Sequence, residues 1–268
     1  MKKFELTAEF VTNVFGKKLF RIKALVAFGN VEKGELGGFI EKENNLSHFG
    51  DAWVSGDAQV SGDARVFGNA WVFGDAWVFD NAQVSGNARV FGNAQVSGDA
   101  QVSGDARVFG NARVFGNAWV FGNAGVFGDA HVSGNALVSG NAWVFGNARV
   151  FGNARVSGDA RVFGNAWVFG NAHVSGDAQV SGNARVSGNA DYAVVKGFGR
   201  YFRATTFFRC KDKIIRVQCG CFYGDLAQFR EIVKKTHGDS KYAKEYLAIA
   251  DLMELHFSDE KKDRGASE

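Results

Sequence analysis

Residues 106–123 read ARVFGN ARVFGN AWVFGN, and this six-residue pattern decides the fold. It continues in both directions, from Ala52 to Asn189, as 23 consecutive hexads of the form A-x-V-(S/F)-G-(N/D) without insertion or deletion. Ala, Val and the Asn/Asp position are kept in every hexad, and Gly is replaced once, by Asp80. Such a repeat predicts a solenoid, in which each repeat packs against its neighbours.

The chemistry of one hexad predicts a short strand followed by a corner. Ala and Val are two positions apart, so in an extended strand their side chains point to one side, while x and Ser/Phe point to the other. Gly and Asn/Asp follow as turn residues, because these types reach positive φ at low cost. A single hexad cannot bury its Ala/Val side alone, so successive hexads must coil until these sides line a common interior.

The Ser/Phe position indicates how many hexads form one coil. Its 12 Phe divide as 6 of 8, 4 of 8 and 2 of 7 when every third hexad is grouped, but as 7 of 12 and 5 of 11 when every second is grouped. Only the grouping by three separates the Phe residues. We therefore predict 18 residues per coil, seven to eight coils, and a rod of roughly 35 Å at about 4.8 Å per coil.

Three stretches resemble known bacterial proteins. Written from Val, the hexad V-(S/F)-G-(N/D)-A-x resembles the hexapeptide repeat of the bacterial transferase superfamily, which implies a left-handed parallel β-helix. Residues 34–41, GELGGFIE, resemble the entry segment of the uncharacterised YdcK-like proteins. Region 205–257, with Cys219-Gly220-Cys221-Phe222 and KYAKEYL at 241–247, resembles a module of prophage proteins of unknown function.

Together these patterns predict an all-β solenoid, a left-handed parallel β-helix with three hexads per coil, carrying an N-terminal β cap and a small C-terminal α+β domain. The caps would protect the open strand edges at the ends of the rod. The expected segments are a cap at 1–51 with a strand at 18–25, the β-helix at 52–189, an α+β domain at 190–257, and a charged, frayed tail at 258–268. In the α+β domain we expect a hairpin of 204–211 and 214–222, turning near Asp212, and helices at 226–236 and 240–257, with Gly238 and Ser240 between them.

Composition limits the partners and the location. The net charge of +3 gives no basic surplus for phosphate binding, so we do not expect nucleic acid as a partner. The N-terminus has no apolar core of a signal peptide, and no run reaches the roughly 20 apolar residues of a membrane span. Three cysteines in the last quarter do not form a disulfide framework. We expect a cytoplasmic protein that does not enter a membrane.

The outward residues carry the main functional signal. All six Trp of the chain occupy x positions. With three hexads per coil, one face combines an unbroken row of Phe with Trp and Arg, whereas the third face holds mostly Ser (Ser85, Ser103, Ser139, Ser157 and Ser175). The candidate binding residues on the first face are Phe73, Phe91, Phe109, Phe127, Phe145, Phe163, Trp53, Trp71, Trp143, Arg89, Arg107 and Arg161.

Two explanations of this face stay open. Rings about 4.8 Å apart stabilise a coil stack by contributing roughly 0.2–1 kcal/mol for each close pair, which needs no partner. Trp, Phe and Arg are also enriched in interfaces. The apolar patch expected on this face should exceed the several hundred Å² that a typical monomer exposes. We predict binding of a protein partner or a second copy of the chain. The array has no Thr column of the kind used to bind ice, and stacking of sugars on Trp would require an extracellular location.

The resemblance to the transferase superfamily suggests an alternative: an acyltransferase with a site between protomers. Such enzymes use a catalytic His and loops that protrude from the coils. The array here has no protruding loop, and its two histidines, His131 and His173, lie on different predicted faces without an Asp or Glu on the same strand. A general base needs a close, oriented partner. We therefore predict a non-catalytic scaffold, without catalytic residues and without a cofactor.

The sequence disfavours two possible metal sites. Calcium at the corner column is disfavoured because 15 of 23 corners are Asn, which carries no charge. Zinc would need Cys210, Cys219, Cys221 and His237, but the CxC spacing is not a CxxC knuckle. A nucleophilic Cys with His237 or His256 lacks an evident orienting group. Free Cys on a hairpin is most often a small buried residue.

Overall fold

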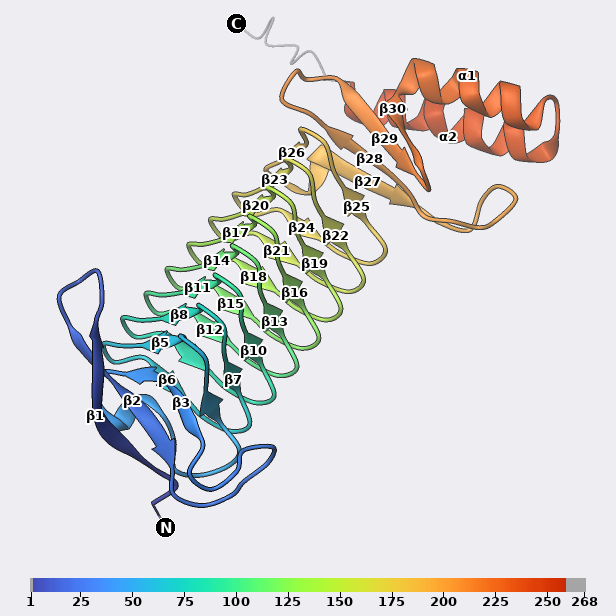
Figure 1. Ribbon diagram of the computed structural model, residues 1–268. Coiled ribbons are helices and arrows are strands. Elements are labelled where there is room, and N and C mark those ends of the chain that lie inside the picture. Colours follow the sequence, from blue (N-terminus) through green and yellow to red (C-terminus); the bar gives the residue numbers. More distant parts are fainter. Residues whose placement is uncertain (1, 259–268) are drawn as a thin grey trace, which may run out of the picture.

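The computed structural model describes residues 2–258 and shows a rod of about eight parallel β-coils (Figure 1). An N-terminal group of strands lies at one end, and a small antiparallel sheet with two helices lies at the other. Each hexad contributes one two-residue strand, which pairs in parallel with the strand 18 residues later. Arg107, for example, pairs with Gly125. The predicted β-solenoid with three hexads per coil is confirmed.

The array has three flat faces, which we name after their outward residues. The Phe face consists of β4 (Trp53–Val54), β7 (Trp71–Val72), β10 (Arg89–Val90), β13 (Arg107–Val108), β16 (Gly125–Val126), β19 (Trp143–Val144), β22 (Arg161–Val162) and β25 (Gln179–Val180). The Arg face consists of β5 (Gln59–Val60), β8 (Trp77–Val78), β11 (Gln95–Val96), β14 (Arg113–Val114), β17 (His131–Val132), β20 (Arg149–Val150), β23 (Trp167–Val168) and β26 (Arg185–Val186). The Ser face consists of β6 (Arg65–Val66), β9 (Gln83–Val84), β12 (Gln101–Val102), β15 (Trp119–Val120), β18 (Leu137–Val138), β21 (Arg155–Val156) and β24 (His173–Val174).

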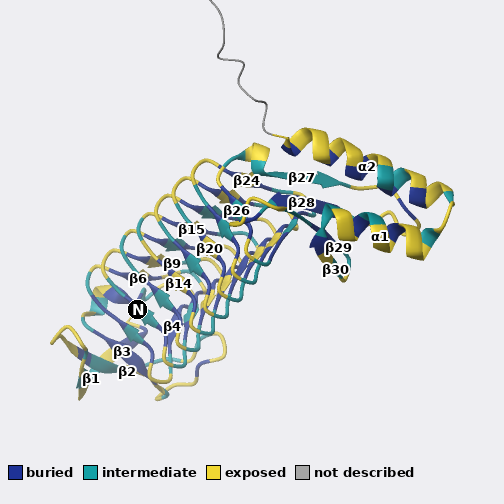
Figure 2. Ribbon diagram, turned by 90° about the horizontal axis from the view of Figure 1, so that it is seen from above, coloured by how far each residue is buried: buried dark blue, intermediate teal, exposed yellow. Residues whose placement is uncertain are grey.

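The interior of the rod is built from the Ala and Val of the repeat. Each of these side chains, from Ala52 to Val186, is at most 1% exposed. Figure 2 shows buried residues recurring in every coil along the rod. Small residues are required because the three faces meet closely around one axis. Burial of apolar area contributes about 25 cal/mol per Å², so each coil adds a similar increment and the rod is stabilised along its whole length.

The corners explain why glycine is nearly invariant. Gly104, at φ 68°, lies so close to the next coil that a Cβ would be 2.9 Å from the nitrogen of Gly122. Asp80 is the one non-glycine residue at such a corner and adopts φ 60°. Its carboxylate accepts a hydrogen bond from the N–H of Gly98 in the next coil at 3.2 Å. Asp tolerates this backbone region better than most residues, which accounts for the exception.

Asn side chains form directional ladders along the corners. The amide Nδ2 of an Asn donates to the Oδ1 of the residue one coil later, and where the acceptor is Asp the ladder stops, because a carboxylate has no proton to donate. The ladders comprise Asn69 to Asn87 to Asp105, Asn81 to Asp99, Asn111 to Asp129, Asn117 to Asn135 to Asn153 to Asn171, Asn123 to Asn141 to Asp159, and Asn147 to Asn165.

The N-terminal region extends the sheet of the Arg face. Its elements are β1 (Phe4–Thr12), β2 (Lys18–Ala24), β3 (Leu36–Ile40) and the 3-10 helix η1 (Glu43–Asn45). β1, β2 and β3 are antiparallel neighbours, and β3 pairs in parallel with β5 of the first coil. The strand expected at 18–25 is confirmed as β2, whereas β1 was not predicted.

Side-chain donors of the cap form hydrogen bonds with unpaired backbone carbonyl groups of the first coil. Lys3 is 3% exposed, and its ammonium donates to the carbonyl oxygens of Gly50 at 3.1 Å and Ala52 at 2.8 Å. The buried amide of Asn45 donates to the carbonyls of Gly62 and Ala64 in the same way. These carbonyls face the open end, where no earlier coil offers an N–H, so the cap supplies the donors that a longer solenoid would provide.

The C-terminal region matches the predicted hairpin and helices. Its elements are η2 (Asn189–Asp191), β27 (Tyr192–Val195), β28 (Thr205–Arg209), β29 (Ile215–Cys219), β30 (Phe222–Asp225), α1 (Leu226–His237) and α2 (Lys241–Phe257). Strands β28 and β29 pair as an antiparallel hairpin. Gly238 caps the end of α1, and the Ser240 hydroxyl accepts from the N–H of Ala243 at the start of α2. The predicted tail begins at Ser258, and its remaining residues, 259–268, lie outside the described residues.

Side-chain acceptors form hydrogen bonds with unpaired backbone N–H groups of the last coil. The N–H of Gln179 donates to the Thr206 hydroxyl of β28 at 2.9 Å, and the N–H of His173 donates to the Asn189 side chain at 2.9 Å. The two ends of the rod therefore need caps of opposite hydrogen-bonding character. Phe208 of β28 joins the interior of the rod, whereas Phe207 on the other side of the strand packs with α1 and α2.

Candidate binding surface

The six Phe of the Phe face form one continuous stack. Neighbouring rings lie 4.8–5.1 Å apart between centroids and 2–6° from parallel. Each ring is half-buried, because the neighbouring rings of the stack cover its faces. The outer edges of the rings still face solvent as a row along the rod, with a period set by the spacing of the strands. The row predicted from the sequence is thus formed by Phe73, Phe91, Phe109, Phe127, Phe145 and Phe163.

Trp and Arg side chains border this row on the same face. Trp143 is 44% exposed and packs edge-on against Phe127, with ring centroids 5.8 Å apart. The guanidinium of Arg161 lies 5.5 Å from the centre of the Trp143 ring, within the range of a cation–π contact. Gly125 has no side chain, and a Cβ there would lie 3.6 Å from Trp143. Arg89, Arg107 and Arg161 are exposed, and Trp71 is half-buried.

Trp53 corrects one prediction for this face. It lies on the Phe face in β4, as its spacing indicates, but it is fully buried and cannot contact a partner. The loop between β2 and β3 folds over it, with the Phe28 ring 5.4 Å away at a steep angle. Trp53 is therefore a core residue of the N-terminal cap. The other eleven predicted residues are at least partly accessible.

The two histidines of the array lie on different faces, in different surroundings. His131 is half-buried on the Arg face, and burial lowers its pKa, helped by the charges of Arg149 and Arg113 on the neighbouring strands. His173 is exposed on the Ser face, and its Nε2 lies 3.0 Å from the Ser157 hydroxyl. The structure brings neither histidine close to the other, and they do not form one site.

The cysteines and His237 occupy separate places in the C-terminal region. Cys210 is buried against the last coil, where burial raises the pKa of its thiol. Cys219 is half-buried and accepts a hydrogen bond from the Thr205 hydroxyl at 3.2 Å. Cys221 is exposed, and His237 stacks on Tyr246. Within residues 2–258, no group of three or more His, Cys, Asp or Glu is arranged to hold a metal ion.

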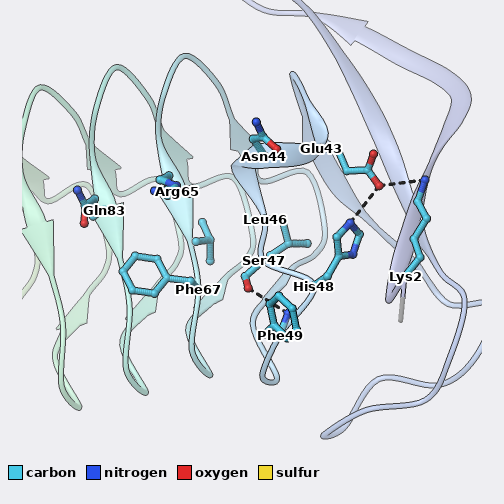
Figure 3. Close-up of a pocket in the computed structure, with 11 residues that line it drawn as sticks. Lys2, Glu43, Asn44, Leu46, Ser47, His48, Phe49, Arg65, Phe67 and Gln83 are labelled. Carbon is cyan, nitrogen blue, oxygen red and sulfur yellow. Dashed lines mark hydrogen bonds and ion pairs between the residues drawn. The ribbon is translucent and has the colours of Figure 1, made fainter.

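A polar cluster at the N-terminal end was not found from the sequence. It borders a hollow of about 890 Å³ beside η1 (Figure 3). His48 accepts a hydrogen bond from the backbone N–H of Lys3 at Nδ1, lies 3.0 Å from the Glu43 carboxylate at Nε2, and stacks on Phe4. The Lys2 ammonium, 2.9 Å from Glu43, is the main cause of the lowered pKa of that carboxyl group.

This cluster anchors the cap and does not form a free catalytic pair. Both ring nitrogens of His48 are engaged by the chain itself, so the ring has no nitrogen left to take a proton from a substrate. Figure 3 shows the Phe67 ring on the side of the hollow away from the ion pair of Lys2 and Glu43. The residues come from the N-terminal segment, η1, the segment between η1 and the first hexad, and the first hexads. No periodicity connects them, which is why sequence reasoning missed the cluster.

Fold and surface together define a β-solenoid repeat protein. Comparison with protein-family models supports this class, since the YdcK β-solenoid repeat matches nine segments of the array. These are residues 58–74, 82–99, 100–114, 106–122, 130–146, 142–158, 148–162, 154–169 and 178–190. The repeats are thus similar to those of YdcK. No curated protein matches the chain at a significant level. Among residues 2–258, no helix is long and apolar enough to span a membrane.

Proposed function

We propose that the protein is a non-catalytic scaffold that associates with a second copy of itself through the Phe face. The observation that supports this most strongly is the stack of six Phe rings at 4.8–5.1 Å, bordered by Trp71, Trp143 and three Arg. A rigid row with this period is best matched by another row with the same period. The surface of a second copy meets that condition at every ring. Symmetric pairing of identical surfaces is also the commonest form of protein oligomer.

The order of the x residues favours one arrangement of the two copies. From β7 to β22 the column reads Trp71, Arg89, Arg107, Gly125, Trp143, Arg161. A two-fold axis that crosses the stack at its midpoint sets the same column of the other copy against it in reverse order. Each Trp then faces an Arg: Trp71 of one copy faces Arg161 of the other, and Trp143 faces Arg89. Arg107 faces Gly125, which has no side chain.

Other registers of this antiparallel pairing are less favourable. A shift by one coil in one direction sets Arg107 against Arg107 of the other copy, and a shift in the other direction sets Arg89 against Arg161. Like charges in close opposition destabilise an interface, whereas cation–π contacts contribute about 0.5–2 kcal/mol each. The proposed register is the one of the three without an Arg–Arg opposition.

Analytical ultracentrifugation of a triple variant tests the association. Replacing Phe91, Phe109 and Phe127 with Ser, the residue that other columns already carry, keeps the fold but removes the centre of the stack. We expect the wild type to sediment as a dimer and this variant as a monomer. The matched control replaces three Phe outside the Phe face, namely Phe67, Phe121 and Phe169, and should remain dimeric. A monomeric wild type would contradict the proposal.

A charge-exchange experiment tests the register. Trp143→Arg places Arg opposite Arg89 of the other copy and should weaken the dimer by tenfold or more. Adding Arg89→Trp to the same chain exchanges the two residues and restores a Trp–Arg pair at both places, so the double variant should regain most of the affinity. Equal weakening in the single and double variants would rule out this register while leaving association through the face intact.

The alternative function is an acyltransferase of the hexapeptide-repeat superfamily. It is tested by incubating the wild type with acyl-CoA and an amine or hydroxyl acceptor, followed by measurement of free thiol. We expect no turnover in the wild type. Turnover that disappears when His131 and His173 are both replaced with Ala would overturn the non-catalytic proposal, whichever oligomeric state is found.

A further inference from the structure

The Arg face carries a column of rings with a gap in it. Where the Phe face has six consecutive rings, this column reads Phe115, Ser133, Phe151, Phe169 at successive coils. Phe151 and Phe169 stack with centroids 5.2 Å apart, as in the Phe face. Phe115 and Phe151 are two coils apart, which places their rings about 10 Å from one another at the usual strand spacing. We call the space above Ser133, between these two rings, the ring gap.

The ring gap is a real hollow with aromatic walls. It has a volume of about 360 Å³ and is lined by Phe115, Ser133 and Phe151 together with His131 and Trp167. Trp167 packs edge-on against Phe151 with centroids 5.9 Å apart, which holds the upper wall in place. Phe115 forms the lower wall and is 39% exposed. A planar ring in the gap would lie about 5 Å from each wall, the same spacing that the chain's own stacks show.

Two arginines place positive charge beside the gap. Arg113, His131 and Arg149 occupy three successive strands, β14, β17 and β20, and His131 pairs in direct register with each of the two arginines. Arg113 and Arg149 also line the hollow. Arg149 contacts the face of Trp167 at 5.3 Å, and in the described part of the chain neither arginine forms an ion pair with a carboxylate. Planar guanidinium groups without a carboxylate partner suit an incoming carboxylate or phosphate.

We infer that the ring gap binds a planar aromatic or heteroaromatic group that carries an anionic substituent. The ring completes the interrupted stack between Phe115 and Phe151, and the anion is held by Arg113 and Arg149. An aromatic carboxylate and a nucleoside monophosphate share this chemistry. This site lies on a different face from the proposed dimer surface, so it stands independently of the self-association.

A second gap in the same column provides an internal control. Ser97 also interrupts the rings, between Phe79 and Phe115. Phe79 is in contact with Phe15 of the N-terminal region, at 5.5 Å between centroids. The x residues of the three coils at this second gap are Trp77, Gln95 and Arg113. The second gap therefore has one arginine beside it, whereas the ring gap has two. It has the same order of Phe, Ser and Phe as the ring gap but one arginine fewer beside it.

The test measures binding of defined probes to the full chain by isothermal titration calorimetry. The probes are 2-naphthoate and AMP; inorganic phosphate and cyclohexanecarboxylate serve as an anion without a ring and a carboxylate without an aromatic ring. We expect saturable binding of at least one aromatic anion and binding at least tenfold weaker for both control compounds. Binding of 2-naphthoate alone identifies a carboxylate ligand, and binding of AMP alone identifies a phosphate ester.

Two variants distinguish the ring gap from the rest of the surface. Ser133→Phe fills the gap with the residue that the repeat itself uses here, so it should preserve the fold and abolish probe binding. Ser97→Phe fills the control gap and should leave binding unchanged within twofold. Arg113→Gln with Arg149→Gln should weaken binding by tenfold or more. The inference is overturned if neither aromatic anion binds the wild type, or if Ser133→Phe binds as tightly as the wild type.

Discussion

The ammonium nitrogen of Lys3 lies 2.8 Å from the carbonyl oxygen of Ala52, the first residue of the first hexad. Burial lowers the pKa of Lys3 to about 8, from 10.5, and the nearby charge of Asp51 opposes part of that shift. The Phe28 ring covers the ammonium from another side, 4.5 Å from its centroid. The Lys3 ammonium therefore supplies hydrogen-bond donors to the open strand edge at the N-terminal end of the rod.

The lowered pKa predicts how stability depends on pH. Between about pH 8 and 10.5 the unfolded chain keeps the proton on Lys3 while the folded chain releases it, so the contribution of this group to stability rises with pH across that window. Over the whole window the gain is on the order of 3 kcal/mol, because each pKa unit corresponds to about 1.4 kcal/mol. Lys3→Met removes the titrating group and the donors to Gly50 and Ala52. We expect Lys3→Met to be less stable than the wild type in urea at pH 7, and the difference to grow at pH 9.5. A difference that stays constant with pH would contradict the assignment.

The interior is tested by substitutions at two adjacent positions. Val114 is fully buried and Arg113 is exposed on the same strand. Val114→Asp buries a carboxylate without a partner and should cost several kcal/mol of unfolding free energy. Arg113→Asp adds the same side chain to the outside and should change stability by less than about 1 kcal/mol. Thermal denaturation followed by circular dichroism measures both. Similar melting of the two variants would refute the inward direction of Val.

The direction of the Asn ladders gives a further prediction. Asn141 accepts from Asn123 and donates to the Asp159 carboxylate at 2.9 Å. Asn141→Asp removes the donor and sets two carboxylates side by side, which should destabilise the rod by roughly 0.2–1 kcal/mol. Lowering the pH towards 4 should reduce this loss, because protonation removes one charge. Urea denaturation at pH 7 and pH 4 measures the effect.

The matched substitution is Asn165→Asp. Asn165 accepts from Asn147 at 3.3 Å, and Asp can take over that role. This variant should be closer to the wild type at pH 7 than Asn141→Asp is. Equal losses of stability in the two variants would show that the donor-to-acceptor direction of the ladders does not affect stability.

The last coil is tested through two adjacent threonines of β28. Thr206 accepts the hydrogen bond of the Gln179 N–H, whereas the Thr205 hydroxyl donates to Cys219. Thr206→Val leaves a backbone N–H without an acceptor and should cost about 1–3 kcal/mol. Hydrogen exchange at Gln179 should accelerate in this variant and stay slow in Thr205→Val. Unchanged exchange in Thr206→Val would show that the coil end does not depend on this contact.

The array was predictable because its information is local and repeated. Ala, Val, Gly and Asn have the same role in each hexad, so the strand, the corner and the 18-residue coil follow from one pattern. The hairpin and both helices of the C-terminal region followed from ordinary signals such as Gly238 and Ser240. The row of six Phe likewise followed from the spacing alone.

The features that were missed depend on contacts between distant segments. Trp53 occupies the same x position, between Ala and Val, as the outward Trp residues, and only the fold of the loop containing Phe28 buries it. Lys3 and Asn45 have no sequence mark that distinguishes them from surface residues, yet they cap the first coil. The ring gap is visible only when Phe115, Ser133 and Phe151 are read as one column and the arginines beside it are placed in space.

The uninterrupted register links the length of the rod to the direction in which each later residue points. Gain or loss of 18 residues would lengthen or shorten the rod by about 4.8 Å and keep each later residue in its column. Gain or loss of a single hexad would instead turn everything that follows by a third of a revolution, breaking the Phe stack and pointing the C-terminal domain to another side. Only a change of three hexads therefore alters the length of the rod while keeping both the Phe stack and the direction of the C-terminal region.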